Sequence, residues 1–185
     1  MITEKETTRI SKFLSLVLRH QPEIIGITLD ENGWVDADLL IKNCNEKGLN
    51  LDIQILKHVV ATNSKKRFAF NEQSNKIRAS QGHSLSIDLG YNPQKPPKIL
   101  YHGTSMKYTD AIWQNGLEKR LRQHVHLSAD MATAMAVGQR HGKPFVFEVL
   151  AEAMYNDHHH FFLSDNDVWL TDHVPVKYLK AFTGS

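Results

Sequence analysis

Apolar positions in the first third of the chain recur three times with the period of an α-helix. The first run stops at Gln21-Pro22, because proline cannot continue a helix. Its apolar face is formed by Ile10, Phe13, Leu14, Val17 and Leu18. Asp36 and Asp52 precede the other two runs and are predicted to cap them. The second helix carries Leu39, Leu40 and Cys44 and ends at Gly48, and the third has Ile55, Leu56, Val59 and Val60 as its buried face.

Short extended runs accompany these helices. A turn at Glu31-Asn32-Gly33 leads into a predicted strand at Trp34-Val35, and "KKRFAFNEQSNKIRAS" predicts two strands around a polar turn. Helices followed by a two-stranded ribbon are typical of a winged helix, a common nucleic-acid-binding shape, although a fold alone does not establish function. A proline-rich stretch then predicts a linker at residues 84–98, between a first domain at 1–83 and a second at 99–185.

The second half of the chain has a different pattern. Ile99-Leu100-Tyr101 predicts a buried strand that runs into "HGT", residues 106–115 predict a helix that ends at Gly116, and "VHLS" predicts a short strand. Ser128 or Asp130 can cap a helix over "MATAMAVGQR". The run "PFVFEVLAEAM" predicts a central strand, and "HFFLSDNDVWLTDHVPVKYLKAF" predicts further strands with turns. The second half is therefore expected to be α+β with a mostly antiparallel sheet.

Composition places the chain among ordinary globular proteins. Of its 185 residues, 41% are hydrophobic and 23% are charged, enough to bury a core. With one cysteine, no apolar run near the length of a membrane span and no apolar core of a signal peptide at the start, we expect a cytoplasmic protein. A net charge of +2 is weak support for a nucleic-acid partner, and the local basic clusters could be solvated surface. These clusters are Lys65-Lys66-Arg67, Lys119-Arg120 with Arg122, and Arg140-His141.

Several classes of site are unsupported by the sequence. The phosphate-loop, dinucleotide-binding and nucleophile-elbow motifs do not occur. No cysteine or histidine spacing typical of a metal site occurs either, and His158-His159-His160 are consecutive, so they cannot all point the same way. We therefore expect no metal.

Two short stretches could carry chemistry. Arg19 and His20 lie side by side at the predicted end of the first helix, where the simplest explanation is that cations favour the negative end of the helix dipole. In the second half, a strand that runs into "HGT" offers an imidazole at His102, a backbone open to close approach at Gly103 and a hydroxyl at Thr104. Such groups suit a ligand with ribose and pyrophosphate, although each piece alone is a weak signal.

The stretches together resemble one family, the RNA 2'-phosphotransferases of the KptA type, which act on tRNA. Seven motifs match in order over essentially the whole chain: "SKFLSLVLRHQP", "GWVDADLL", "KKRFAF", "IRASQGHS", "LYHGTS", "HVHLSAD" and "VGQRHGKP". The resemblance implies an N-terminal winged-helix lobe and a C-terminal lobe with an ADP-ribosyltransferase-like fold. It also implies that NAD, as co-substrate and without a metal, is used to remove an internal 2'-phosphate from RNA in splicing or repair. The implied products are 2'-hydroxyl RNA, nicotinamide and ADP-ribose 1'',2''-cyclic phosphate.

The same resemblance implies roles for individual residues. The family's catalytic set falls on Arg19, His20, Arg67 and Arg140. Contacts with the RNA strand are implied for Lys65, Lys66, Arg78, Gln81, Gly82, His83 and Ser84. Contacts with NAD are implied for His102, Gly103, Thr104, Ser105, His126 and Ser128.

One departure from the wider ADP-ribosyltransferase pattern is visible. Many such enzymes carry a glutamate that activates the acceptor, and the late run "NDVWLTD" offers no obvious equivalent. A phosphate monoester has a second pKa near 6, so at pH 7 it is largely dianionic and is already a nucleophile. What it needs is positioning and partial neutralisation, which arginine forks provide. His20 is then the candidate acid or base for a second step.

Two other classes of protein remain open at this point. A winged-helix regulator with a ligand-binding second domain would place positive charge on its recognition helix, where the run after Asp52 offers only Lys57 and His58. An ADP-ribosyltransferase that modifies nucleic-acid ends would share the NAD site and stop after the first step. We expect a monomer, with the phosphate-binding groups of both lobes sharing one phosphate.

Overall fold

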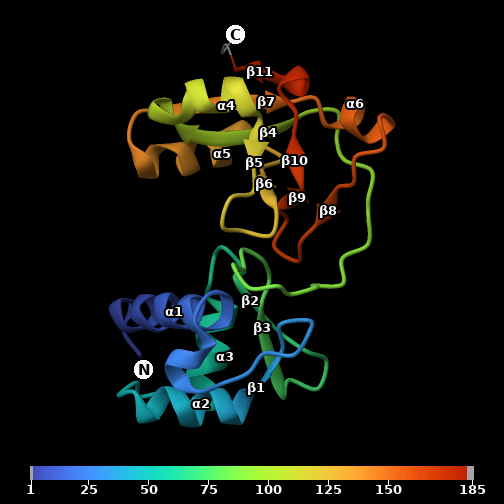
Figure 1. Cartoon of the computed structure of the whole chain (residues 1–185). Coiled ribbons are helices and arrows are strands. Elements are labelled where there is room, and N and C mark those ends of the chain that lie inside the picture. The colour runs from blue at the N-terminus through green and yellow to red at the C-terminus, as the bar shows by residue number, and fades with distance from the viewer. Residues whose placement is uncertain (1, 183–185) are drawn as a thin grey trace. The chain divides into compact units, whose positions relative to one another are not determined.

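The computed structural model of the chain describes residues 2–182, which fall into two compact units (Figure 1). Unit 1 is Met1–Gly90 and unit 2 is Tyr91–Ser185. Both units combine helices with small sheets, and every strand pair among the described residues is antiparallel. The prediction of α+β structure with mostly antiparallel pairing is confirmed at this level.

Unit 1 contains three α-helices and one three-stranded sheet among its described residues. Its elements are α1 (Glu4–Arg19), the 3-10 turn η1 (Pro22–Ile25), β1 (Val35–Asp36), α2 (Ala37–Glu46), α3 (Ile53–Ala61), β2 (Phe68–Phe70) and β3 (Lys76–Ala79). The strand order is β1-β3-β2, with Val35 opposite Ile77 and Phe70 opposite Ile77 on the other side. The three predicted helices and the predicted hairpin are confirmed, and the short strand before α2 joins the hairpin as its third strand.

Side chains at the N-termini explain where these helices begin. The Asp36 carboxylate accepts a hydrogen bond from the Leu39 N–H (2.8 Å), and that of Asp52 accepts one from the Ile55 N–H (2.7 Å). Each bond satisfies a backbone donor that has no partner within the helix. Thr3 caps α1 in the same way, with the Glu6 side chain bonding back to it. Both predicted aspartate caps are confirmed.

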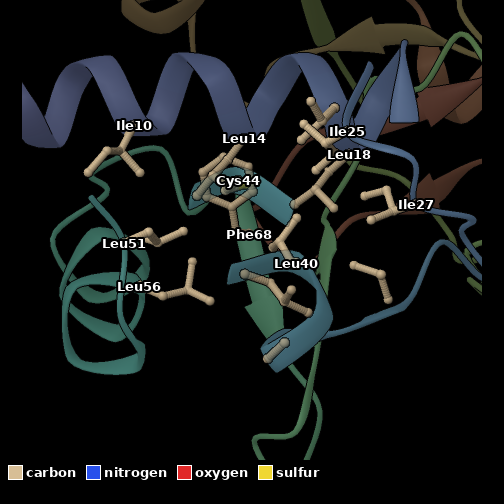
Figure 2. Close-up of a cluster of buried hydrophobic side chains, with 14 of the residues drawn as sticks. Ile10, Leu14, Leu18, Ile25, Ile27, Leu40, Cys44, Leu51, Leu56 and Phe68 are labelled. Atoms are coloured by element: carbon tan, nitrogen blue, oxygen red, sulfur yellow. The ribbon is translucent and has the colours of Figure 1, made fainter. Parts of the chain in front are cut away.

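The core of unit 1 lies between the helices and the sheet (Figure 2). Leu14 and Leu18 of α1, Leu40 of α2 and Leu56 of α3 are fully buried there. The exception to the predicted pattern is Leu39, which is 42% exposed on the outer side of α2. On α3, Leu56 and Val59 are fully buried and their predicted neighbours on that face, Ile55 and Val60, are buried only in part.

Unit 2 holds three small sheets and three α-helices among its described residues. Its first elements are β4 (Leu100–Ser105), η2 (Met106–Tyr108), α4 (Thr109–Asn115), β5 (Leu117–Glu118), β6 (Val125–Leu127), α5 (Met131–Gly138) and η3 (Gln139–His141). Those that follow are β7 (Pro144–Val149), α6 (Ala151–Asn156), β8 (Phe162–Leu163), β9 (Trp169–Thr171), β10 (His173–Val174), η4 (Val176–Tyr178) and β11 (Leu179–Ala181). The sheets have the orders β11-β7-β4, β6-β9-β8 and β10-β5.

The strand β7 lies at the centre of its sheet, as predicted, and β4 pairs with it along its whole length. Helices cover both faces of this pair (Figure 1). Trp113 of α4 contacts Phe147 of β7 edge to face, with ring centroids 4.9 Å apart. Gly103 of β4 faces the backbone of α5, and because neighbouring side chains alternate along a strand, His102 and Thr104 point to the face opposite α5.

In unit 2 one predicted strand segment is wrong, and two other predicted elements are confirmed with small differences. The run 151–154, predicted as strand, is the start of α6, because Ala-Glu-Ala-Met are strong helix formers and β7 ends at Val149. The "HGT" motif lies within β4, which continues to Ser105. The helix predicted over 106–115 starts as the 3-10 turn η2 and becomes α-helical at Thr109, and Gly116 ends it as predicted.

The proline-rich stretch is bonded to both units. On the unit 1 side, the Asp88 N–H donates to the Glu31 carbonyl (2.9 Å). On the unit 2 side, the Gln94 N–H donates to the Phe161 carbonyl (2.8 Å), and Lys95 pairs with Glu152 (3.0 Å). Residues 84–90 thus group with unit 1 and residues 91–98 with unit 2.

Candidate active site

The C-terminal end of α1 gathers groups from three separate segments of unit 1. An Arg19 Nη2–H donates to the Arg67 carbonyl (3.4 Å), and the Ser84 N–H donates to the Arg19 carbonyl (3.0 Å). His20 is exposed, and its Nδ1 lies 3.0 Å from the Ser84 hydroxyl. The structure therefore brings together Arg19, His20, Arg67 and Ser84, which sequence motifs far apart had suggested.

The loop before β2 is held in a fixed shape. The Asn63 side-chain carbonyl accepts from the N–H groups of Lys65 (3.2 Å) and Arg67 (3.4 Å). Lys66 has a left-handed backbone (φ 41°), and its carbonyl accepts from the Ser80 hydroxyl (2.9 Å). A left-handed conformation is unfavourable for a lysine and persists because surrounding bonds fix it. The loop thereby exposes Lys65 and Lys66 beside the half-buried Arg67.

A groove begins at this cluster and follows α1. It has a volume of about 640 Å³ and lies between α1, α3 and the loop after α3. Arg19 and Arg67 line it, together with Lys12, Ser15, His58 and Asn63 among others. We call it the α1–α3 groove.

His83, which the resemblance assigns to the RNA strand, lies inside unit 1. It is 1% exposed, and its ring lies against the backbone of Leu18 at the end of α1. Burial, together with the charges of Arg19, His20 and Arg78, lowers the pKa of His83 to about 4. The ring is therefore neutral at pH 7 and lies beneath the cationic cluster.

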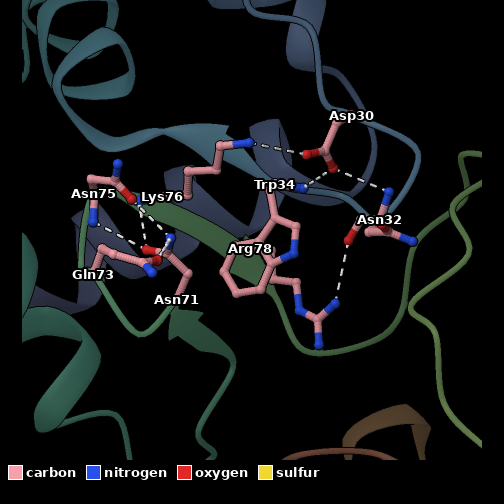
Figure 3. Close-up of polar contacts among 8 residues, drawn as sticks. All are labelled: Asp30, Asn32, Trp34, Asn71, Gln73, Asn75, Lys76 and Arg78. Atoms are coloured by element: carbon pink, nitrogen blue, oxygen red, sulfur yellow. Dashed lines mark hydrogen bonds and ion pairs between the residues drawn. The ribbon is translucent and has the colours of Figure 1, made fainter.

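Arg78, also assigned to the RNA strand, makes bonds that hold unit 1 together (Figure 3). Its guanidinium carbon lies 4.5 Å from the centre of the Trp34 ring, and its Nη1 donates to the carbonyls of Leu89 (3.2 Å) and Asn32 (3.5 Å). These contacts fasten residues 84–90 to the turn before β1. Its motif neighbours Gln81 and Gly82 are half-buried.

In unit 2, the two motifs assigned to NAD lie on neighbouring strands. Tyr101 of β4 and Ser128, just after β6, exchange two backbone hydrogen bonds of 2.9 and 2.8 Å. The His102 Nδ1 lies 3.0 Å from the His126 carbonyl. Because a carbonyl can only accept, this nitrogen carries the proton, and the His102 Nε2 is left as an acceptor. Thr104 (8% exposed) and Ser105 (3%) follow on the same strand.

Burial lowers the pKa of His102, the nearby charge of Arg122 lowers it further, and the hydrogen bond to the His126 carbonyl opposes both. The pKa therefore lies below its ordinary value of 6.5. His102 is mostly neutral at pH 7, which agrees with its role as an acceptor at Nε2.

Arg122 contacts one of these residues, His126, although the sequence motifs did not single it out. One of its Nη1–H groups donates to the His126 Nδ1 (2.7 Å). A guanidinium cannot accept, so the proton of His126 is on Nε2, which becomes a donor. Arg122 is exposed overall, and desolvation of its guanidinium lowers its pKa. The sequence did show it in a basic cluster, but nothing in that cluster distinguished it from Lys119 or Arg120.

Gly103 has a different reason to be glycine from the one predicted. A Cβ built on it would lie 1.6 Å from the Ala134 carbonyl oxygen of α5, so a side chain there would push this helix off β4. Gly138 does the same from the helix side, since its Cβ would lie 2.6 Å from the Thr104 carbonyl oxygen. The small residues permit close packing of α5 on β4, and the backbone of this helix occupies the space at the Gly103 Cβ position.

Arg140 lies on η3, the short turn that continues α5, and it is exposed. This turn packs against β4. Gly142 ends it with φ 124°, and a Cβ there would meet the Ser105 hydroxyl at 3.0 Å. Arg140 is thus placed at the end of β4 that carries Thr104 and Ser105.

Two features are absent from the part of the chain that the structure describes. Between residues 2 and 182, no cluster of three or more His, Cys, Asp or Glu side chains could hold a metal ion. In the same range, no helix is long and apolar enough to cross a bilayer.

Comparison with known proteins decides the family. The family model described as "RNA 2'-phosphotransferase, Tpt1 / KptA family" matches residues 5–173. The chain belongs to this family. Proteins named probable RNA 2'-phosphotransferase from Flavobacterium johnsoniae and Hahella chejuensis are 54% and 51% identical to it, over 179 and 182 residues. These alignments cover 97% and 98% of this chain, and 98% of each relative. One from Rhodopirellula baltica is 52% identical over 97% of this chain and 98% of its own.

Membership identifies the chain as an enzyme of the transferase class. The matched range takes in most of both units, including the end of α1 and the strands β4 and β6, so the clusters at these places belong to one member of the family.

Proposed function

We propose that this RNA 2'-phosphotransferase removes an internal 2'-phosphate from RNA in two steps, with NAD as the co-substrate. The observation that carries the proposal is the cluster at the end of α1, where Arg19, His20 and Arg67 meet. A phosphate dianion needs such planar donor forks, and no metal, to be positioned and partly neutralised. The finer description of unit 1 as a winged-helix lobe and of unit 2 as an ADP-ribosyltransferase-like lobe is part of the same proposal.

The donors of unit 2 fit the chemistry of NAD. A neutral His102 offers an acceptor at Nε2 for a ribose hydroxyl, and His126 offers a donor at Nε2. Arg122 supplies a cation for the pyrophosphate. Gly103, Thr104, Ser105 and Ser128 complete the proposed NAD contacts, with Gly103 acting through its backbone.

In the first step the 2'-phosphate, held by Arg19, Arg67 and Arg140, attacks the anomeric carbon of the nicotinamide ribose. The bond to nicotinamide breaks, and nicotinamide leaves as a neutral base. The product is RNA-2'-phospho-ADP-ribose. Because the nucleophile is already a dianion at pH 7, this step requires no general base.

In the second step the ribose 2''-hydroxyl attacks the phosphorus and expels the RNA 2'-oxygen. A proton leaves the attacking hydroxyl and one is taken up by the RNA oxygen. We assign proton transfer to His20, whose ring is exposed and is oriented by Ser84. The arginines stabilise the charge that develops on the non-bridging oxygens.

For the RNA strand, we retain Lys65, Lys66, Gln81, Gly82 and Ser84 as contacts, since the two lysines and Ser84 are exposed and the other two half-buried. His83 and Arg78 are proposed to act indirectly. This indirect role is supported by the burial of His83 and by the contacts of Arg78 with Trp34, Asn32 and Leu89, which hold residues 84–90 in place.

The experiment is product analysis with RNA that carries a single labelled internal 2'-phosphate, incubated with NAD and a chelator. We expect 2'-hydroxyl RNA, nicotinamide and a labelled ADP-ribose cyclic phosphate. RNA that gains ADP-ribose and goes no further would instead identify an ADP-ribosyltransferase. Unchanged RNA would contradict both and favour a binding protein.

A further inference from the structure

The α1–α3 groove is a feature of unit 1 that the catalytic cluster does not explain. Its 640 Å³ extend beyond Arg19 and Arg67 toward the N-terminus of α1, where Glu4 lines its far end. A single phosphate is held by the cluster and does not require a groove of this length. The groove is therefore wide enough for a further part of the ligand that the cluster binds.

The positions along α1 show how the groove is built. Ser11, Ser15 and Arg19 are spaced four residues apart and so form one line along the helix. Lys12 lies seven residues before Arg19, which is about 10.5 Å along the helix axis. It is exposed, and it places a second positive charge in the groove well away from the catalytic phosphate.

The hydroxyl groups of Ser15 and Ser11 each keep some hydrogen-bonding capacity that the bonds within the protein do not use. Ser15 donates to the Ser11 carbonyl (2.8 Å), so its oxygen can still accept. The Ser11 hydroxyl accepts from the Asn63 amide (2.9 Å), so its own proton can still be donated. Ser15 lies between Lys12 and Arg19, and Ser11, which is 8% exposed, lies beside Lys12, so the groove offers an acceptor and a donor for hydroxyl groups.

The lining also indicates that the groove does not recognise bases. Among the described residues that line it there is no Phe, Tyr or Trp, the side chains on which unpaired bases stack. Most of its side chains are short hydroxyls, an amide, an imidazole and cations, and the remaining three are Ile2, Val59 and the carboxylate of Glu4. This combination suits ribose and phosphate, and it is unsuited to recognition of a particular base.

We propose that the α1–α3 groove binds the ribose-phosphate backbone of the RNA strand next to the 2'-phosphorylated nucleotide, without regard to sequence, and that Lys12 contacts a flanking phosphate. The proposal rests on the proposed function, since it assumes that Arg19 and Arg67 hold the 2'-phosphate. Glu4 sets the far limit of the groove, because a carboxylate repels phosphate.

The test measures binding of a 2'-phosphorylated dinucleotide and of the same substrate lengthened one nucleotide at a time, on the 5' side or on the 3' side. In the wild-type protein we expect affinity to rise with lengthening on one side. Lys12→Ala should lose about fivefold of that gain at low salt and leave dinucleotide binding unchanged. The slope of log affinity against log salt should fall by about 0.7, the value for one phosphate contact with a single strand.

Lys42→Ala is the matched control, because Lys42 is an exposed lysine of the same unit that lies outside the groove. A gain from lengthening that is equal in wild type and Lys12→Ala, or absent in the wild type, would overturn the proposal. Failure of the proposed function would look different, because the wild-type protein would then not convert the dinucleotide at all.

Substrates with deoxyribose in the flanking positions test the hydroxyl contacts separately. They keep every phosphate and lose the groups that Ser11 and Ser15 are proposed to bind. We expect them to bind more weakly than all-ribose substrates, with the same salt slope. Equal affinity would overturn the ribose part of the proposal.

Discussion

Arg19 and His20, at the C-terminal end of α1, do more than interact favourably with the helix dipole, because both side chains also contact residues far away in the sequence. The Arg19 guanidinium bonds the carbonyl of Arg67, a residue 48 positions away, and His20 contacts Ser84, 64 positions away. A purely local role for these cations would not require such distant partners. The fixed orientation of both side chains therefore favours a functional role, with stabilisation of α1 as a secondary effect.

The buried His83 predicts a dependence of stability on pH. Its pKa is about 4 in the folded chain against 6.5 for an unperturbed histidine, so the unfolded chain binds the proton more tightly. Stability is therefore lost as pH falls from 6.5 to 4, by about 3 kcal/mol in total. In His83→Leu, this part of the pH dependence should disappear, and urea unfolding at several pH values measures it.

The His83→Leu protein should keep most of its stability at pH 7, because leucine fills the same buried position with an apolar side chain that needs no hydrogen-bond partner. His58→Gln, at an exposed position of the same unit, is the control and should retain the wild-type pH dependence. An unchanged pH dependence in His83→Leu would contradict the assignment of a neutral buried ring.

Arg122 predicts a separation of NAD binding from RNA binding. Arg122→Ala removes the cation proposed for the pyrophosphate and the donor that fixes the tautomer of His126, so the KM for NAD should rise by about tenfold or more. The KM for RNA should not change. Steady-state kinetics with each substrate varied in turn measure this, and nitrogen NMR of the histidines should show mixed tautomers of His126.

Lys119→Ala is the matched control for Arg122, since it removes a neighbouring charge whose exposed ion pair with Asp172 (3.4 Å) lies outside the proposed site. Its KM for NAD should stay at the wild-type value. An unchanged KM for NAD in Arg122→Ala would show that the guanidinium does not take part in the site.

At the scale of elements, the sequence was sufficient wherever a local signal determines a boundary. Asp36 and Asp52 mark helix starts because their carboxylates bond nearby N–H groups, an interaction within three residues. The strand-or-helix choice at 151–154 could not be made from apolar content, because a buried helix and a buried strand look alike over so short a run. The reason for Gly103 was also hidden, because it depends on α5, about 30 residues later.

The packing of α5 on β4 predicts a large cost for a single methyl group. In Gly103→Ala the new Cβ meets backbone, which cannot move aside as a flexible side chain would, so we expect a loss of about 3 kcal/mol or more in unfolding free energy. Gly48→Ala is a suitable control. Nothing lies within 4 Å of its added Cβ, and only its φ of 81° opposes the change, at about 1–2 kcal/mol.

Urea unfolding of both variants tests the comparison. A Gly103→Ala protein as stable as wild type would mean that α5 does not pack on β4 in this way. A stable protein with impaired use of NAD would restore the interpretation in which Gly103 lies against the ligand.

At the scale of the whole molecule, the candidate site could be predicted from motifs and the contacts could not. The motifs placed Arg19, His20 and Arg67 in one set and "YHGTS" and "HVHLS" in another, and the structure brings the members of each set close together within their unit. What they could not supply is which member bonds which. Arg78 and His83 belong to a motif that the resemblance assigns to RNA, and yet Arg78 bonds carbonyl groups of unit 1 and His83 is buried. Arg122 lies outside the seven motifs and yet bonds His126.

The two-step reaction predicts a specific defect in Arg67→Ala. Charge builds on the non-bridging phosphate oxygens in the second step, and a fixed donor there contributes about 3–4 kcal/mol, or two to three decades in rate. Arg67 lies in a loop held by Asn63 and Ser80, which suits fixed donation. RNA-2'-phospho-ADP-ribose should therefore accumulate at saturating RNA. If Lys65, Lys66 and Arg67 only bind the RNA strand, the rates of both steps in Arg67→Ala should return to the wild-type values at high RNA concentration.

The central claim is that the 2'-phosphate itself attacks NAD and is then transferred away. The most direct measurement is a single-turnover time course with wild-type protein, labelled 2'-phosphorylated RNA, NAD and a chelator, quenched at intervals and resolved on a gel. We expect RNA-2'-phospho-ADP-ribose to rise and then decay as 2'-hydroxyl RNA and ADP-ribose cyclic phosphate appear. Release of the label as inorganic phosphate, or loss of the 2'-phosphate without NAD, would contradict it.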